Sequence, residues 1–210
     1  MKVILNCAMS VDGKIALPTR RETKISNRED LTRVHSLRNE VDAILVGVGT
    51  IITDDPKLTV GEKYVKPKKH PLRIVLDSKG RTPEKARVLD NSAKTLIVTN
   101  ESCTRNFPGA EVLRVGKWRV DIAALVKKLD TMGIKTLLVE GGENVLWSFL
   151  RDGVADELSV FVGSMIIGGT SSPTPAGGEG FREFGRVRKL KLLEGKRLGD
   201  GVLLRYEVVK

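Results

Sequence analysis

The chain has 210 residues, of which 40% are apolar and only 4% are aromatic. This composition can supply the core of one domain and excludes a largely disordered chain, and Val, Ile and Leu must build that core. The net charge of +10 indicates a basic surface or phosphorylated ligands. The distribution of this charge disfavours a nucleic-acid partner, because the basic residues are spread along the chain without interleaved aromatic rings.

The first predicted elements are a strand, a helix and a second strand. The apolar run at 3–9 predicts a buried strand. Ser26 and Glu29 have the spacing of a capping box, and apolar residues recur at helical spacing, so we expect a helix over 28–40. The continuous apolar run at 43–48 predicts a central strand that leads into a short helical turn.

The rest of the chain alternates between predicted strands and helices. Asp121 is expected to cap one helix, and Gly141-Gly142 to open another. The alternating tail at 190–192 and 202–209 predicts an antiparallel hairpin. Further strands are predicted at 72–77, 95–99, 111–115, 136–140 and 158–162. The pattern predicts one α/β domain over residues 1–210, with a mostly parallel central sheet flanked by helices and an antiparallel C-terminal hairpin.

Several classes of protein are disfavoured. No apolar run reaches the ~20 residues that span a bilayer, and the first strand is followed too soon by polar residues to be a signal peptide. Two Cys and two His without close spacing form neither a disulfide framework nor a conventional zinc site. We therefore expect a cytoplasmic protein with no metal and no membrane partner.

Ligands of parallel sheets bind beyond the carboxyl ends of strands, and two of these ends are rich in glycine. Gly47-Val48-Gly49-Thr50 begins like a dinucleotide fingerprint, but Ile52 replaces the third glycine and no acidic ribose ligand follows. It is either a phosphate-binding turn or a closely packed strand-to-helix turn. Glu140-Gly141-Gly142 places a carboxylate and two glycines at the start of a helix, which favours anion binding over a plain turn.

Two further turns have open interpretations. Asp54-Asp55-Pro56 is either a functional carboxylate pair or a solvated loop, and the turn at 77–81 is either a surface turn or a cationic clamp for the 2′-phosphate of NADP. We expect a structural role for His35. Trp118 and Trp147 are expected in the core or an interface rather than as stacking platforms.

Taken together, these segments resemble a known family. They lie, in family order, at 6–16, 26–38, 42–59, 71–78, 140–142, 156–157 and 167–169. The chain is similar to the riboflavin-pathway reductases, and in particular to their stand-alone archaeal and fungal type. This resemblance implies a dihydrofolate-reductase-like fold, NADPH as cofactor, a homodimer, and hydride transfer to C1′ of 2,5-diamino-6-ribosylamino-4(3H)-pyrimidinone 5′-phosphate.

The resemblance implies that the cofactor and the point of hydride transfer are lined by Gly49, Thr50, Asp54, Ser78, Glu140, Gly141 and Gly142. We add Asp77, Gly80 and Val139 to the cofactor side, and we expect Lys79 and Arg81 to bind the 2′-phosphate, because a bidentate Arg suits that anion. On the substrate side we expect Asn6, Ser10, Asp12, Lys14, Ser26, Asp55 and Arg73, with Lys14 and Ser26 near the 5′-phosphate. The catalytic candidates are Glu140 and Asp55, which would hold ribose hydroxyls or relay a proton.

Three alternatives stay open. The bacterial relatives carry a fused zinc deaminase and act on the deaminated pyrimidine; the lack of a zinc motif here, and Asn6 where they tend to have Lys, favour reduction before deamination. A pterin reductase is disfavoured by the scarcity of aromatic residues and the polar first strand. A basic nucleic-acid-binding module without activity would bind with a steep salt dependence.

Overall fold

The computed structural model describes residues 1–21 and 23–210. Its helices are α1 (Arg28–Glu40), α2 (Val48–Asp54), α3 (Ile122–Thr131) and α4 (Glu143–Arg151), with 3-10 turns at Arg87–Leu89 and Phe184–Arg186. Its strands are β1 (Lys2–Ser10), β2 (Ala43–Gly47), β3 (Leu72–Leu76), β4 (Thr95–Thr99), β5 (Glu111–Arg114), β6 (Thr136–Gly141), β7 (Glu157–Gly163), β8 (Leu190–Leu198) and β9 (Gly201–Val208). Within the described part, no helix is long and apolar enough to cross a membrane.

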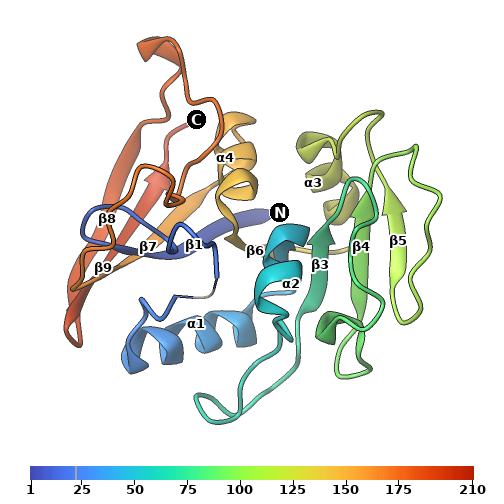
Figure 1. The fold of residues 1–210 in the computed structure, drawn as a ribbon, viewed down its shortest axis with the longest axis horizontal. Coiled ribbons are helices and arrows are strands. Elements are labelled where there is room, and N and C mark those ends of the chain that lie inside the picture. The colour runs from blue at the N-terminus through green and yellow to red at the C-terminus, as the bar shows by residue number, and fades with distance from the viewer. Residues whose placement is uncertain (22) are drawn as a thin grey trace.

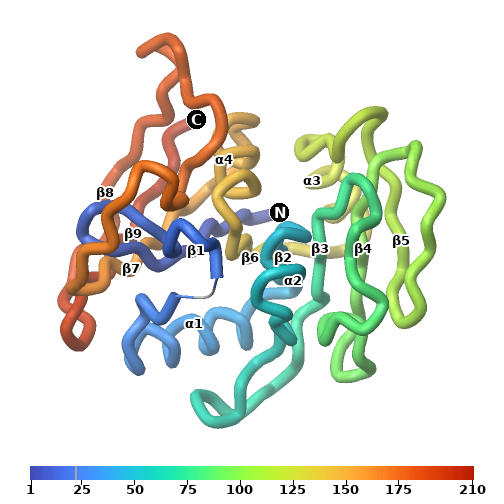
Figure 2. Tube along the Cα trace, viewed as in Figure 1, coloured from blue at the N-terminus to red at the C-terminus, as the bar shows by residue number. Residues whose placement is uncertain are grey.

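The described strands form one sheet in the order β5-β4-β3-β2-β6-β1-β7-β9-β8 (Figures 1 and 2). Strands β1 to β7 are parallel to their neighbours among themselves, and β9 and β8 add an antiparallel hairpin to β7. The predicted fold class is therefore confirmed. The carboxyl ends of the seven parallel strands share one edge of the sheet.

The two faces of the sheet bury different cores, because side chains alternate along each strand. Leu125 of α3 and Phe149 of α4 pack on one face, beside Leu5 and Val139. The other face buries Ile44, Val46 and Val75 beneath Val48 and Ile51 of α2. Figure 1 shows α4 above the strands and α1 below them.

Most of the predicted boundaries agree with the structure. The predicted strand ends lie within one residue of the observed ends, except in β8. The alternation at 190–192 indicated only the start of β8, which continues to Leu198 because its backbone pairs with β9 although its side chains are mostly exposed. Backbone pairing with β9 therefore sets the length of β8, and the sequence of an exposed strand shows no apolar pattern from which that length could be predicted.

Helix α1 has the predicted bounds but a different cap. Asn27 is the N-cap, since its side chain accepts a hydrogen bond of 2.8 Å from the Asp30 N–H. Ser26 instead donates to the Asp30 carboxylate at 2.5 Å, so the capping role expected for it is wrong. Asp30 is itself fully buried against the sheet. The two buried residues of α1, Asp30 and Asn39, are both polar.

Candidate functional site at the carboxyl edge of the sheet

Two glycine turns lie side by side at the carboxyl edge. Strands β2 and β6 are neighbours, with Leu45 opposite Val139. A β-carbon placed at Gly47 would lie 4.0 Å from the backbone nitrogen of Gly142, and one placed at Gly142 would lie 3.8 Å from Oγ1 of Thr50. The two glycine turns therefore adjoin at this edge of the sheet.

The backbone of this junction faces open space. A β-carbon at Gly49 or Gly141 would meet no other atom within 4 Å. Gly141 has a φ of +115°, a conformation that side chains rarely allow, and its peptide bond to Gly142 is cis. The absence of side chains lets a flat ring or a phosphate approach the backbone closely. The residues at this junction therefore fit a dinucleotide cofactor.

Glu140 is held at the rim of the junction by Arg38 of α1. The Arg38 guanidinium donates two hydrogen bonds to the Glu140 carboxylate, at 2.9 and 2.6 Å, and a third to the Thr59 carbonyl at 3.1 Å. Burial opposes the charge of Arg38, but the charge and hydrogen bonds of Glu140 raise its pKa. Bidentate pairing fixes the plane of the carboxylate. Sequence reasoning gave Arg38 no role, although it lies one helical turn from His35.

His35 packs beside this pair as a neutral ring. Its Nδ1 accepts a hydrogen bond of 2.9 Å from the Gly61 N–H, and its ring stacks on Tyr64 at 4.6 Å between centroids. The pKa of His35 is lowered to about 4, mainly by burial and also by the charges of Arg38 and Lys63, while the charge of Glu140 acts in the opposite direction. These contacts support the structural role predicted for His35.

The packing of His35 predicts a pH-dependent stability. The ring is stable when neutral, so its contribution is complete above the unfolded pKa of 6.5 and is lost as the pH falls toward 4. His35→Asn keeps an acceptor for the Gly61 N–H but does not titrate. Between pH 7 and pH 4, wild type should lose about 1–2 kcal/mol more unfolding free energy than this variant, as measured by urea unfolding. An equal loss in both proteins would contradict this assignment.

Two of the predicted substrate residues lie against α1. Asn6 is buried, and its side-chain carbonyl accepts a hydrogen bond of 2.8 Å from Arg33. Arg33 also donates to Ser159 and to Asp30. Ser26 donates to Asp30, as described above. The structure thus brings Asn6 and Glu140 to the same face of the sheet and adds Arg33, which sequence reasoning missed.

The turn after β1 uses two of its predicted substrate residues internally. Ser10 donates to Asp12 at 2.5 Å and accepts from the Lys14 N–H at 3.0 Å. Asp12 also accepts from the backbone N–H groups of Ile167 and Gly168. The hydrogen bond from Ser10, followed by that from Ile167, lowers the pKa of Asp12 to about 2. Ser10 and Asp12 therefore hold this turn against the loop at 167–168. The ammonium group of Lys14 has no partner among the described residues.

In the turn after β3, some of the predicted cofactor residues are buried and others are exposed. Asp77 is fully buried, and its Oδ2 accepts two hydrogen bonds from Thr82, at 2.6 and 2.7 Å, whereas its Oδ1 has no hydrogen-bond partner. Gly80 has a φ of +69°, and a β-carbon there would lie 2.8 Å from Sγ of Cys103. Lys79 and Arg81 are exposed, and neither has a hydrogen bond or ion pair within the described residues. Two unpaired cations thus remain at this turn.

The structure places Arg73 inside the protein, away from the glycine junction. Its side chain is fully buried, and it donates to Thr95 at 2.9 Å and to Asp90 at 2.7 Å, with further bonds to backbone carbonyls. It lies near the amino end of β3, at the edge opposite the glycine junction. All of its donors are satisfied by the protein, so it ties β3 and β4 to the segment at 90–93.

The remaining predicted residues occupy different positions around the site. Val139 is fully buried in the core under α4, so only its backbone lies at the junction. Asp54 ends α2, and Asp55 follows it with a φ of 41°. The Asp55 carboxylate accepts from the Arg87 N–H at 2.8 Å, and the structure shows no contact between it and Glu140. Ser78 accepts from the Val120 N–H at 3.2 Å.

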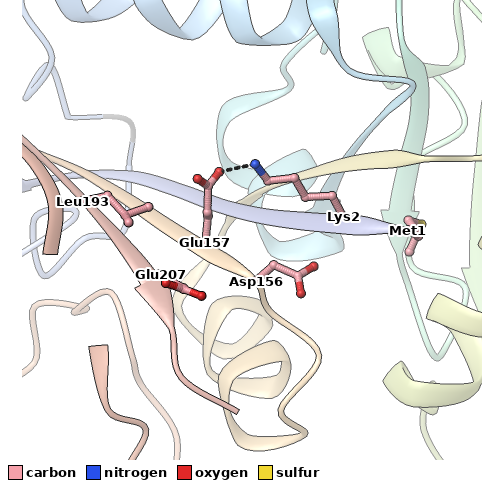
Figure 3. Close-up of a pocket in the computed structure, with 6 residues that line it drawn as sticks. All are labelled: Met1, Lys2, Asp156, Glu157, Leu193 and Glu207. Carbon is pink, nitrogen blue, oxygen red and sulfur yellow. Dashed lines mark ion pairs between the residues drawn. The ribbon is translucent and has the colours of Figure 1, made fainter. Parts of the chain in front are cut away.

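A hollow lies at the opposite edge of the sheet, near the amino ends of β1 and β7. It has a volume of about 490 Å³ and is lined by Met1, Lys2, Asp156, Glu157, Leu193 and Glu207. Figure 3 shows Lys2 reaching toward Glu157, with which it forms an ion pair of 2.8 Å. No predicted site residue lines this hollow, which therefore lies apart from the candidate site.

Comparisons with known proteins cover almost the whole chain. A family model described as the RibD C-terminal domain matches residues 1–204. A 2,5-diamino-6-ribosylamino-4(3H)-pyrimidinone 5′-phosphate reductase of Methanothermobacter thermautotrophicus is 42% identical, over 98% of this chain and 97% of that protein. A protein of the same name from Archaeoglobus fulgidus is 38% identical, over 95% of this chain and 94% of that protein. A Thermotoga maritima crystal structure, titled a diaminohydroxyphosphoribosylaminopyrimidine deaminase/5-amino-6-(5-phosphoribosylamino)uracil reductase, is 27% identical, with a TM-score of 0.84 over 99% of this chain and 56% of that one.

Proposed function

The chain belongs to the RibD C-terminal domain family, and from this premise we propose that it is a reductase of riboflavin biosynthesis. Its substrate is 2,5-diamino-6-ribosylamino-4(3H)-pyrimidinone 5′-phosphate, the compound in the names of relatives that match it along nearly their whole length. The observation that carries the proposal is the junction of two open glycine turns beside a fixed carboxylate, Glu140. This arrangement suits the alignment of a cofactor with a polar substrate.

NADPH is the proposed cofactor, and it would supply a hydride when bound. The open backbone at Gly49 and Gly141 fits close approach by the cofactor. Lys79 and Arg81 offer two exposed cations without described partners, which suits the extra phosphate that distinguishes NADPH from NADH. The turn that carries them follows β3, the neighbour of β2 in the sheet.

The residues of the chain have separate tasks in this reaction. As C1′ gains hydride, one of two bonds breaks. In the closed ribose it is the C1′–O4′ bond, and one proton must reach O4′; in an open-chain imine it is the π bond, and one proton must reach the nitrogen, which stays bonded to C1′. Glu140 moves this proton or holds the ribose hydroxyls that fix the sugar, and Arg38 keeps its carboxylate in place. Lys14 and Ser26 are the proposed contacts of the 5′-phosphate.

An anaerobic assay tests the proposed function. The purified protein is given NADPH or NADH with the diamino pyrimidinone, its deaminated analogue or dihydrofolate, and oxidation of the cofactor is followed. We expect the fastest turnover with NADPH and the diamino compound. Faster turnover of the deaminated analogue would reassign the substrate, and oxidation with dihydrofolate alone would favour a pterin reductase. Salt-sensitive oligonucleotide binding without any turnover would support the nucleic-acid alternative.

We also propose a homodimer, formed through the C-terminal hairpin. Leu190, Leu192 and Val202 are each more than 40% exposed, and the strand register places them on one face of β8 and β9. An apolar face on a hairpin at the edge of a sheet is a surface that association covers. Sedimentation at the mass of two chains is the expected result, and sedimentation at the mass of one chain would refute the dimer.

A further inference from the structure

Trp118 is exposed at a site where the chain is held in place. Its side chain is 80% exposed, whereas Trp147, the other tryptophan, is buried against Phe181. Of the two places expected for Trp118, the core or an interface, the structure excludes the core. An exposed aromatic ring on a fixed backbone is a candidate ligand contact, since a rigid ring can bind a ligand at little cost in conformational entropy.

Three hydrogen bonds fix the turn that carries Trp118. The Trp118 carbonyl accepts from the Asn100 side chain at 2.9 Å, and the Val120 N–H donates to Ser78 at 3.2 Å. The Gly116 carbonyl accepts from the Glu101 N–H at 2.8 Å. The turn after β5 is thereby fastened to the loops that follow β3 and β4. The indole is presented by a constrained turn.

The same hydrogen bonds place Trp118 near the proposed phosphate clamp. Ser78, which bonds the turn, directly precedes Lys79 in the loop that also carries Arg81. Strand β5 lies three strand positions from β2, a separation of roughly 14 Å at about 4.8 Å per step. The glycine junction and Trp118 therefore lie apart from each other along the carboxyl edge, as contacts with the two halves of an extended dinucleotide would require.

The surroundings of the ring indicate what kind of ligand it fits. Its neighbours in the turn, Lys117 and Arg119, are both exposed, and the Lys117 ammonium lies 5.6 Å from the indole centroid. A cationic setting suits an aromatic base that carries phosphate better than an apolar protein surface. We propose that the Trp118 indole stacks on the adenine ring of the dinucleotide whose 2′-phosphate lies on Lys79 and Arg81. This inference rests on the proposed function, because it assigns a residue to one end of the same cofactor.

Calorimetric titration of three probes tests the stacking role. The probes are NADPH, adenosine 2′,5′-bisphosphate and reduced nicotinamide mononucleotide, which lacks the adenosine. Trp118→Ala should weaken the first two by about tenfold and leave the third unchanged, while Trp118→Phe should restore most of the affinity. Phe184→Ala is the matched control, since Phe184 is also an exposed aromatic residue, at 87%, and lies in a different loop; it should change none of the three affinities.

The outcomes separate the inference from the function on which it rests. If wild type binds NADPH and the bisphosphate, and Trp118→Ala binds both equally well, the stacking role is refuted and the proposed cofactor stands. If Trp118→Ala weakens the mononucleotide as much as NADPH, the ring acts on the turn as a whole and the inference is refuted. If wild type binds neither NADPH nor the bisphosphate, the cofactor proposal fails and the inference fails with it.

Discussion

Glu140→Gln is expected to lower kcat by about 10²- to 10⁴-fold, with a much smaller change in the KM for NADPH. The substitution keeps the shape of the side chain but removes a group that can transfer a proton and that pairs with Arg38 at 2.6–2.9 Å. Steady-state assays over a range of pH measure the effect. A proton-transfer role also predicts that one limb of the pH–kcat profile disappears in the variant. A rise in KM alone would reassign Glu140 to substrate binding.

Two comparison variants distinguish the chemistry of Glu140 from its ion pair. Arg38→Gln breaks the same pair but leaves the carboxylate in place, so an equal fall in kcat in both variants would limit Glu140 to positioning. Asp55→Asn tests the other candidate carboxylate, which accepts from the Arg87 N–H in this structure. A larger fall in kcat for Asp55→Asn than for Glu140→Gln would move the proton-transfer role to Asp55.

Replacing Lys79 and Arg81 together by alanine is expected to raise the KM for NADPH by about 100-fold and to change the KM for NADH little. Each cation would form charge-assisted hydrogen bonds with the 2′-phosphate, worth about 1.5–3 kcal/mol where solvent does not screen them, and both side chains are exposed. Only NADPH carries that phosphate. The ratio of the two KM values in wild type and variant measures the effect.

The control for this variant removes the same charge elsewhere. Lys85 and Lys94 are exposed, and neither side chain has a hydrogen bond or ion pair among the described residues. Lys85→Ala/Lys94→Ala should leave the preference for NADPH intact. Similar losses for NADH and NADPH in the Lys79/Arg81 variant would indicate a general electrostatic effect and would contradict the clamp.

The sequence predicts the fold well because its core strands are nearly continuous apolar runs. Strands buried on both faces need such runs, as at β2 and β4, and their ends follow from the polar residues beside them. The apolar period of α1 also gave its bounds. Its cap was predicted one residue early, because Ser26 and Asn27 are both good capping residues and only the backbone conformation decides which of them meets the Asp30 N–H.

The site is less predictable, because a polar side chain can serve a ligand or its own fold. Arg73 and Asp77 lie in motifs that resemble those of a family, yet both are fully buried and form hydrogen bonds within the protein. Arg38 and Arg33 were missed because their partners, Glu140 and Asn6, lie 102 and 27 residues away in sequence. Spacing along one sequence carries no signal for such contacts.

The order of the strands has a consequence for how a bound cofactor would act on the protein. The β2–β6 pair is the seam between two blocks, one built from residues 43–114 and the other from both ends of the chain. A molecule that binds the turns on both sides of this seam would stabilise the contact between the two blocks. By mass action it would oppose their separation by RT ln(1 + [L]/Kd), so the coenzyme would protect against unfolding as well as take part in the chemistry.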